Sequence, residues 1–228
     1  MISSRREALP APFLLLLALW AFSAPAAAQH VADDDDDSPQ YKAAIAQAAK
    51  HSATPQFKQA LALIAKETGQ PGEPDTDHKG IVYFKSAEKD AEALLAKLQP
   101  RVAALKCIFV RCEMKHGIGD EPDTLALVGV DNPWAAMWMF GTNAANYDRD
   151  TAAVVKWMQR FAKENDVTFD TISFDLCAGR FNKPPVDYAA MAKKMYEFCP
   201  DIVDQGTGDV EKLAAELKRT GRFFFWWD

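Results

Sequence analysis

The sequence has 228 residues, of which 49% are hydrophobic and 25% charged, and its formal net charge is −6. A chain of this length and composition can bury a core without disulfide or metal staples. Residues 33–37 supply five negative charges, and the body from Ser38 onward carries only about −2. It therefore lacks the basic footprint of a protein that binds nucleic acid or anionic lipid.

The first 28 residues have the pattern of an export signal. Arg5 and Arg6 precede an apolar run at residues 13–22, and three alanines at residues 26–28 provide a cleavage site after Ala28. The apolar run is shorter than the roughly 20 residues that span a bilayer, so an uncleaved anchor is the less favoured alternative and we expect no stable membrane insertion after cleavage. The mature chain is therefore expected to be periplasmic, which presumes a two-membrane bacterium, or secreted.

Four cysteines, Cys107, Cys112, Cys177 and Cys199, would enter an oxidising compartment, where four thiols can pair in three ways. If Cys107 and Cys112 lie on one strand, their odd separation places them on opposite faces, which disfavours a bridge between them. A bridge between Cys177 and Cys199 stays open.

The segments that precede the main domain are an acidic tether and a helical extension. Residues 29–40 contain the run of aspartates and predict a disordered tether, because like charges repel and stay solvated. A calcium site is disfavoured there, since consecutive carboxylates lack the spaced ligands and turn glycine of a calcium loop. Residues 41–79 predict short helices followed by a glycine- and proline-rich linker, with Thr54 as the N-cap of the better-marked helix and Gly69 as its end.

Residues 80–228 alternate between strand-like and helix-like segments. Strands are expected at residues 81–84, 107–112, 124–130, 167–175 and 223–227. Helices are expected to follow Ser86 as N-cap, Pro133, Asp148 or Asp150 as N-cap, Asp187 and Asp209. Because residues 107–130 predict a hairpin, the sheet should be mixed. The pattern predicts an α/β or α+β fold, with a mixed sheet covered by helices and preceded by the short helical extension.

The last third of the chain carries a family resemblance. Residues 199–206 read CPDIVDQG, the chain ends in FFFWWD, and residues 141–148 read GTNAANYD. These segments resemble the signature of the bacterial family known as domain of unknown function 4253, whose similar loop more often has a glycine in place of Ala144 or Ala145. The resemblance covers roughly residues 80–228 and implies where a site lies, but no activity.

The CPDIVDQG segment concentrates a thiol, two carboxylates and an amide around a turn. Asp201 and Asp204 could act as acid, base or cation ligands and Cys199 as a nucleophile. The alternative, which we favour, is that the aspartates cap local backbone and Cys199 is a small buried residue. No histidine lies near Cys199 in sequence, no CxxC or HExxH zinc pattern is present, and no phosphate-binding or dinucleotide-binding glycine motif occurs.

The leading hypothesis is a small exported binding or interaction domain for an unknown small molecule or protein, with no cofactor assigned. The alternative is a carboxylate-based hydrolase or transferase at the same surface, with or without a divalent cation. Convergence of the aspartates in one pocket would favour the enzyme, whereas their dispersal as caps of local backbone would favour the binding domain. The candidate ligand-binding residues are Asn146, Tyr147, Asp148, Cys199, Asp201, Asp204, Gln205, Trp226, Trp227 and Asp228.

Overall fold

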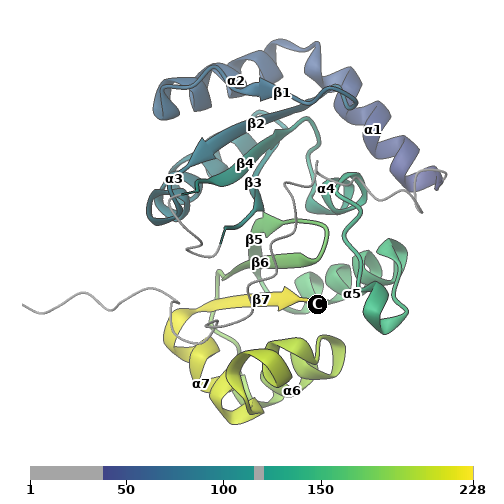
Figure 1. Cartoon of the computed structure of the whole chain (residues 1–228), viewed down its shortest axis with the longest axis vertical. Helices are drawn as coiled ribbons and strands as arrows, with labels where there is room; N and C mark the ends of the chain where they lie inside the picture. The colour runs from purple at the N-terminus through teal and green to yellow at the C-terminus, as the bar shows by residue number, and fades with distance from the viewer. Residues whose placement is uncertain (1–37, 116–120, 228) are drawn as a thin grey trace, which may run out of the picture.

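The computed structural model describes residues 38–115 and 121–227, which form one mixed seven-stranded sheet with helices on both faces (Figure 1). The strands are β1 (Glu73–Pro74), β2 (Ile81–Ser86), β3 (Ile108–Glu113), β4 (Asp123–Val128), β5 (Val167–Ile172), β6 (Leu176–Phe181) and β7 (Arg222–Trp226). They lie in the order β1-β2-β4-β3-β5-β6-β7, and neighbours are antiparallel except β3 and β5. The predicted mixed sheet is confirmed, and of the two predicted classes, α/β and α+β, the fold is α+β. The predicted signal and most of the tether lie outside the described residues.

The described residues also form seven α-helices and two shorter helical turns, of which α1 and α2 precede the first strand. They are α1 (Pro39–Ser52), α2 (Pro55–Thr68), α3 (Glu88–Ala103), α4 (Pro133–Met139), the 3₁₀ turn η1 (Ala145–Tyr147), α5 (Thr151–Glu164), α6 (Tyr188–Phe198), the π-helical turn η2 (Ile202–Thr207) and α7 (Val210–Thr220). None of these helices has the length and apolar character that crossing a membrane requires.

Most helices begin where a side chain caps them, as the sequence predicts. Thr54 accepts from the backbone N–H of Phe57, and Gly69 ends the same helix in the left-handed conformation. Of the two candidate caps for α5, Asp150 accepts from the backbone of Ala153. The prediction that Ser86 caps α3 is wrong. Ser86 is the last residue of β2 and pairs with Asp123 of β4, so the strand ladder continues through it and α3 begins without a side-chain cap.

The predicted strand at residues 167–175 is too long. β5 ends at Ile172, and a tight turn leads into β6, an antiparallel neighbour that the sequence analysis did not predict. β6 contains Gly179, which weakens its strand signal but is required by packing. A Cβ at this position would lie 2.1 Å from the carbonyl oxygen of Thr168 and 2.8 Å from the ring of Phe223. The predicted C-terminal strand is confirmed as β7, which pairs with β6 at the edge of the sheet.

The two faces of the sheet bury different cores. Helices α2 and α3 cover strands β2, β4 and β3 on one face with a mainly aliphatic core. Helices α1, α4 and α5 lie on the other face, where the C-terminal part of the core is rich in aromatic rings, and α6 and α7 lie beside the edge strand β7 (Figure 1). Cys107 belongs to the first core and Cys112 packs against the second, which confirms that they lie on opposite faces, and Cys107, Cys177 and Cys199 are free thiols. Helices α1 and α2 both contribute to these cores; the proposed domain boundary at residue 80 stays a prediction.

The sheet is narrowly joined between β3 and β5. These parallel strands share a single register pair, Arg111 with Thr171. From the α3 side, the buried amide of Gln99 donates to two backbone oxygens, that of Phe109 on β3 at 3.1 Å and that of Phe169 on β5 at 3.0 Å. The side chain therefore links two strands where regular pairing has stopped.

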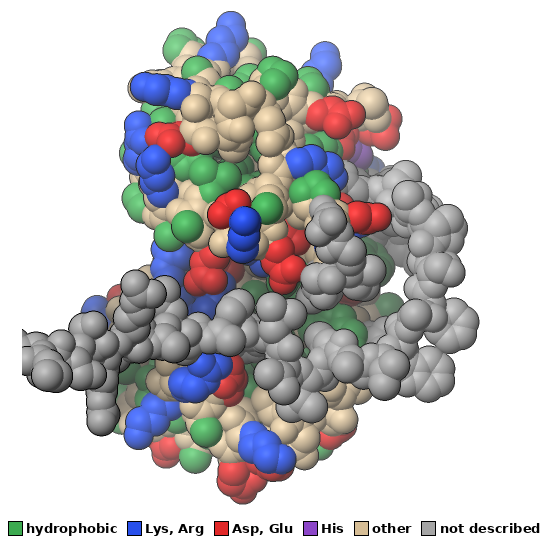
Figure 2. All heavy atoms as spheres, turned by 60° about the vertical axis from the view of Figure 1, so that its left-hand side comes forward, with side chains coloured by type: hydrophobic (Ala, Val, Ile, Leu, Met, Phe, Trp, Pro, Cys, Tyr) green, Lys and Arg blue, Asp and Glu red, His purple; other side chains and the backbone are tan. Residues whose placement is uncertain are grey.

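Beside this joint, the C-terminal strands carry charged side chains on the α3 side of the sheet. Arg222 Nη2 donates to Asp170 Oδ2 at 2.7 Å, and Arg180 Nη1 lies 3.9 Å from the same buried oxygen. Arg222 also binds Glu92 of α3 at 2.9 Å, and Arg180 donates to Gln99. The side of the molecule shown in Figure 2 accordingly has acidic and basic side chains next to one another.

Candidate functional site

Two segments singled out from the sequence meet in space. Tyr147, in the GTNAANYD loop, donates its hydroxyl to Asp201 Oδ1 of the CPDIVDQG turn at 2.5 Å. Gln205 Nε2 donates to the same carboxylate oxygen at 3.1 Å. Asp201 is therefore a shared acceptor that holds the loop and the turn together.

The C-terminal strand joins the same group. The thiol of Cys199 donates to the backbone oxygen of Trp226 at 2.9 Å, so the turn is attached to the end of β7. One residue later, the backbone N–H of Trp227 donates to the oxygen of Asp175 at 3.0 Å, which ties the terminus to the turn between β5 and β6. These contacts place the site at the end of the sheet where β7 stops.

The turn between β5 and β6 also holds the GTNAANYD loop. Thr142 Oγ1 donates to the oxygen of Ser173 at 2.7 Å, and the N–H of Asn143 donates to the oxygen of Phe174 at 2.9 Å. The Phe174 side chain itself is 43% exposed, which is unusual for a large apolar group. This β5–β6 turn thus presents an aromatic ring to solvent beside the loop.

The CPDIVDQG turn is built around η2, a π-helical turn over Ile202–Thr207 that ends at Gly208 in the left-handed conformation. π-Helical turns are rare and frequently occur at functional sites. This turn buries Ile202 and Val203 and leaves Asp204 and Gln205 exposed. The sequence analysis placed a polar turn here but did not predict a π-helix.

The two carboxylates of the turn have different environments. Asp201 is 4% exposed and accepts from Tyr147, whose pKa is raised by burial and by the neighbouring carboxylate. Asp204 is exposed and accepts from the hydroxyl of Tyr196 at 3.1 Å, a hydrogen bond that raises the pKa of Tyr196. Both tyrosines stay protonated at neutral pH, and each therefore serves as a hydrogen-bond donor to one aspartate.

The remaining polar candidates lie at the rim or outside the described residues. Asn146 and Asp148 are exposed on either side of Tyr147, and Asp148 has a φ of 52°, a left-handed conformation that aspartate tolerates better than most residues. Asp228 lies outside the described residues. Asp148, Asp201, Asp204 and Asp228 are therefore not shown as one group, and the described residues contain no cluster of three or more histidine, cysteine or acidic side chains suited to a metal ion.

Residues 124–228, from β4 to the end of the chain, match the model of a known family, the domain of unknown function (DUF4253). This part of the chain is a DUF4253 domain. The match contains all the segments that meet at the site, whereas α1 to α3 and β1 to β3 precede it. Comparison with curated proteins and comparison with solved structures each found no significant match.

Cys199 of the DUF4253 domain has its thiol in a buried environment. It is fully buried, and burial raises the pKa of its thiol to about 12, although hydrogen bonds and the Arg149 charge act in the opposite direction. Arg149 does not bind the sulfur in the described structure. Its guanidinium lies 4.9 Å from the centre of the Phe198 ring and donates to the backbone oxygen of Phe198. A neutral buried thiol is a poor nucleophile, so the geometry favours the packing role of Cys199.

The two terminal tryptophans of the DUF4253 domain point to opposite faces, as strand alternation predicts. Trp227 is 3% exposed and packs against Phe198 and Phe225, whereas Trp226 is partly exposed. Among the described residues, the indole Nε1 of Trp227 has no hydrogen-bond acceptor. A buried N–H group without an acceptor is uncommon in folded proteins.

Two site residues were missed by the sequence analysis. Arg149 directly follows the GTNAANYD segment, and Tyr196 lies one helical turn before Cys199. Their positions next to the family segments were a signal, but their roles depend on contacts made in the fold. Tyr196 reaches Asp204 from α6, and Arg149 reaches Phe198 across about 50 residues of sequence.

Proposed function

We propose that this protein is a binding domain whose recognition surface lies at the end of the sheet where the three family segments meet. The observation that carries the proposal is the contrast between a buried frame and an exposed rim. Tyr147, Asp201 and Cys199 are used to hold the segments together. The side chains left for a partner are Asn146, Asp148, Asp204, Gln205 and the partly exposed Trp226.

This geometry supports binding better than carboxylate catalysis. An acid–base pair needs two carboxyl groups that face the same reacting atoms. Here Asp201 is buried beneath Tyr147 and Asp204 is exposed beside Tyr196, so the two groups share neither a hydrogen-bond partner nor a degree of burial.

The rim has the chemistry to recognise cationic groups and hydrogen-bond donors. Asp148 and Asp204 supply carboxylates, and the amides of Asn146 and Gln205 supply further acceptors. Electrostatic complementarity would then select a partner that presents lysine, arginine or amine groups. Such a partner is a protein segment or a small cationic molecule.

The test compares two charge-neutralising substitutions. Asp204→Asn removes an exposed carboxylate from the rim, and Glu211→Gln removes one from the exposed side of α7 as a matched control. Binding of a lysine-rich peptide and of spermidine is measured by calorimetry for the wild type and both variants. We expect the Asp204→Asn variant to bind at least about fivefold more weakly and Glu211→Gln to bind as the wild type does. Equal affinity of all three proteins, or no binding of either probe, would contradict the proposal.

A third variant separates the frame from the rim. Asp201→Asn weakens the shared acceptor of Tyr147 and Gln205, and we expect a loss of about 1–3 kcal/mol in unfolding free energy. Asp204→Asn should change this free energy by less than about 0.5 kcal/mol, because its side chain is exposed. Equal losses of unfolding free energy for the two variants would contradict the division of the site into a buried frame and an exposed rim.

We further propose that the domain acts outside the cytoplasm, in the periplasm or after secretion. The support is the signal pattern of residues 1–28, in particular the apolar run and the alanines before Gln29. Mass spectrometry of the protein produced from the full coding sequence should find Gln29 as the first residue. An intact N-terminus in the cytoplasmic fraction would show that the signal is not used.

A further inference from the structure

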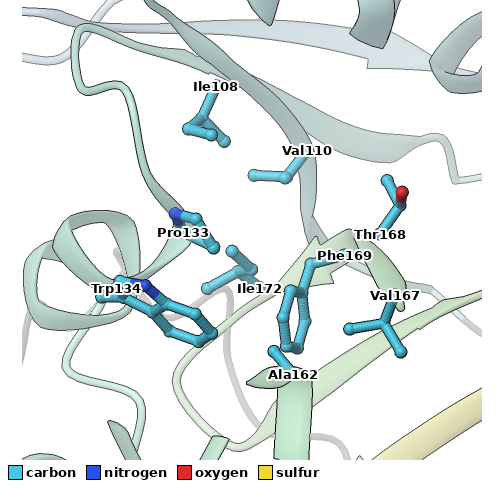
Figure 3. A pocket seen from close by; sticks show the side chains of 9 residues that line it. All are labelled: Ile108, Val110, Pro133, Trp134, Ala162, Val167, Thr168, Phe169 and Ile172. Carbon is cyan, nitrogen blue, oxygen red and sulfur yellow. The ribbon is translucent and has the colours of Figure 1, made fainter. Parts of the chain in front are cut away.

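A cavity of about 230 Å³ lies where the two parts of the sheet separate, on the face opposite α3. Figure 3 shows the side chains that surround it, from β3, α4, α5 and β5. The lining residues are Ile108, Val110, Pro133, Trp134, Ala162, Val167, Thr168, Phe169 and Ile172. This cavity is separate from the rim described above and does not include any of its residues.

The cavity follows from the way in which β3 and β5 are joined. The strands share only the Arg111–Thr171 pair, and β5 has an irregularity between Phe169 and Thr171. Where regular pairing ends, Gln99 bridges the strands from the opposite face. The two strands that border the cavity are therefore linked by the buried hydrogen bonds of Gln99. The walls of the cavity are strands and helices, which position side chains more rigidly than loops do.

The lining is apolar and carries no charge. The only polar side-chain groups are the indole N–H of Trp134 and the hydroxyl of Thr168, and that hydroxyl already donates to Asn182 Oδ1 at 3.0 Å. A second hollow of similar volume, beside β1, differs because Glu73 and Lys85 help to line it. An ionised ligand in the first cavity would lose its hydration without gaining a charged partner, which is strongly unfavourable.

Two aromatic walls indicate the shape of ligand that fits. The rings of Trp134 and Phe169 lie 5.7 Å apart between centres and at 79° to each other, and Figure 3 shows both beside the same space. A flat ring can lie against one wall while its edge meets the other, which is the arrangement that aromatic pairs prefer. Ile108, Trp134 and Val167 are partly exposed, so a ligand can enter from solvent.

We propose that this cavity binds a small uncharged molecule built on one aromatic ring system. An apolar protein cavity of about 150 Å³ is large enough for benzene, so the larger space here admits a molecule of the size of toluene or indole. Ligands with so few atoms reach dissociation constants on the order of 1 mM or somewhat below.

The experiment uses indole as the probe and the protein produced from the full coding sequence. Ala162→Met places a flexible apolar side chain at the cavity and should weaken indole binding at least tenfold, measured by ligand-observed saturation-transfer NMR. Ala152→Met, at an exposed position of the same helix, is the matched control and should bind as the wild type does. Benzylamine and benzoate, which carry charges, should each bind at least tenfold more weakly than indole.

A second measurement keeps the proposal testable if Ala162→Met does not fold. The indole Nε1–H resonance of Trp134 is assigned by its absence from the spectrum of Trp134→Phe, and it should shift in a saturable way when indole is added to the wild type. No saturable binding up to about 10 mM, a shift confined to other tryptophans, or equal binding by Ala162→Met would overturn the proposal. A dimer that Ala162→Met dissociates would also overturn it, because the cavity would then be part of an interface between copies.

Discussion

The N-terminal strands β1-β2-β4-β3 and the C-terminal strands β5-β6-β7 belong to one sheet but are stabilised differently. In the N-terminal part, helices cover both faces, and all six residues of β4 are buried. In the C-terminal part, helices and an aromatic core cover one face, the other carries the Asp170 and Arg222 pair, and β7 alternates between buried and partly exposed residues. The burial pattern of a strand thus follows from what covers each face, even within one sheet.

The difference explains where the candidate sites lie. The aromatic core around Trp157, which stacks on Phe198 with ring centres 3.9 Å apart, supports the end of β7 and the CPDIVDQG turn. The cavity lies at the joint, where neither part of the sheet supplies a full set of strand partners.

The largest effect is expected from Phe161→Ala in the aromatic core. Phe161 is fully buried and contacts the rings of Phe223 and Phe225, so truncation should cost about 3–5 kcal/mol of unfolding free energy. Leu98→Ala, in the aliphatic core beneath α3, should cost about 2–5 kcal/mol. Urea unfolding measures both losses, and a cost below about 1 kcal/mol for Phe161→Ala would show that this core is not tightly packed.

The same unfolding experiment tests whether the two parts are coupled. Trp157, Trp226 and Trp227 lie in the C-terminal part, so their fluorescence in a Trp134→Phe/Trp138→Phe variant reports on that part, whereas far-ultraviolet circular dichroism reports on the whole chain. Because the parts share a sheet and the Gln99 link, the two transitions should coincide. Separate midpoints would divide the molecule at the joint between β3 and β5.

A smaller loss is expected from Arg222→Met, which removes the closest cation from the buried Asp170. We expect a loss of about 2–3 kcal/mol of unfolding free energy. This is less than for a buried charge with no cation nearby, because Arg180 remains 3.9 Å from the same oxygen. The double variant Asp170→Asn/Arg222→Met should cost less than the two single variants added together. Arg219→Met, which breaks an exposed pair with Glu216, is the control and should change stability by less than about 1 kcal/mol.

Gln99→Leu tests the link between the two parts directly. The substitution keeps a side chain of similar size but leaves the oxygens of Phe109 and Phe169 without their shared donor, and it should lower the unfolding free energy by about 1–3 kcal/mol. Amide hydrogen exchange should become faster in β3 and β5 than in β2 or β6. Gln47→Ala, which removes an exposed hydrogen bond to Asp131, should have little effect. Unchanged exchange in Gln99→Leu would mean that the strands hold together without the amide.

The smallest effect concerns the edge of the N-terminal part. Burial alone would raise the pKa of Asp75, but hydrogen bonds from the Tyr83 hydroxyl and the backbone N–H groups of His78 and Asp77 outweigh it, and the net pKa is lowered. A lowered folded-state pKa adds stability that is present above the ordinary value of 3.8 and is lost as the pH falls through the folded value. Unfolding followed between pH 6 and pH 2.5 should therefore show a shallower acid loss in Asp75→Asn than in the wild type. Identical pH profiles would show that these hydrogen bonds do not favour the ionised carboxylate.

The sequence by itself determined the features that depend on nearby residues. The caps at Thr54 and Asp150, the left-handed end at Gly69 and the C-terminal strand are set by side chains and backbone preferences within a few positions. Family segments were also visible, because residues such as those of CPDIVDQG are contiguous. These features need no knowledge of which distant segments meet.

The tertiary structure alone decided the pairing of β6, the separation of β3 from β5 and the roles of the site residues. Gln99 reaches Phe169 across 70 residues and Tyr147 reaches Asp201 across 54. Whether a carboxylate such as Asp201 is buried or, like Asp204, exposed depends on these long-range contacts, since burial is a property of the whole packed chain. Local patterns could therefore mark the polar turn, but only the folded arrangement separates its buried aspartate from its exposed one.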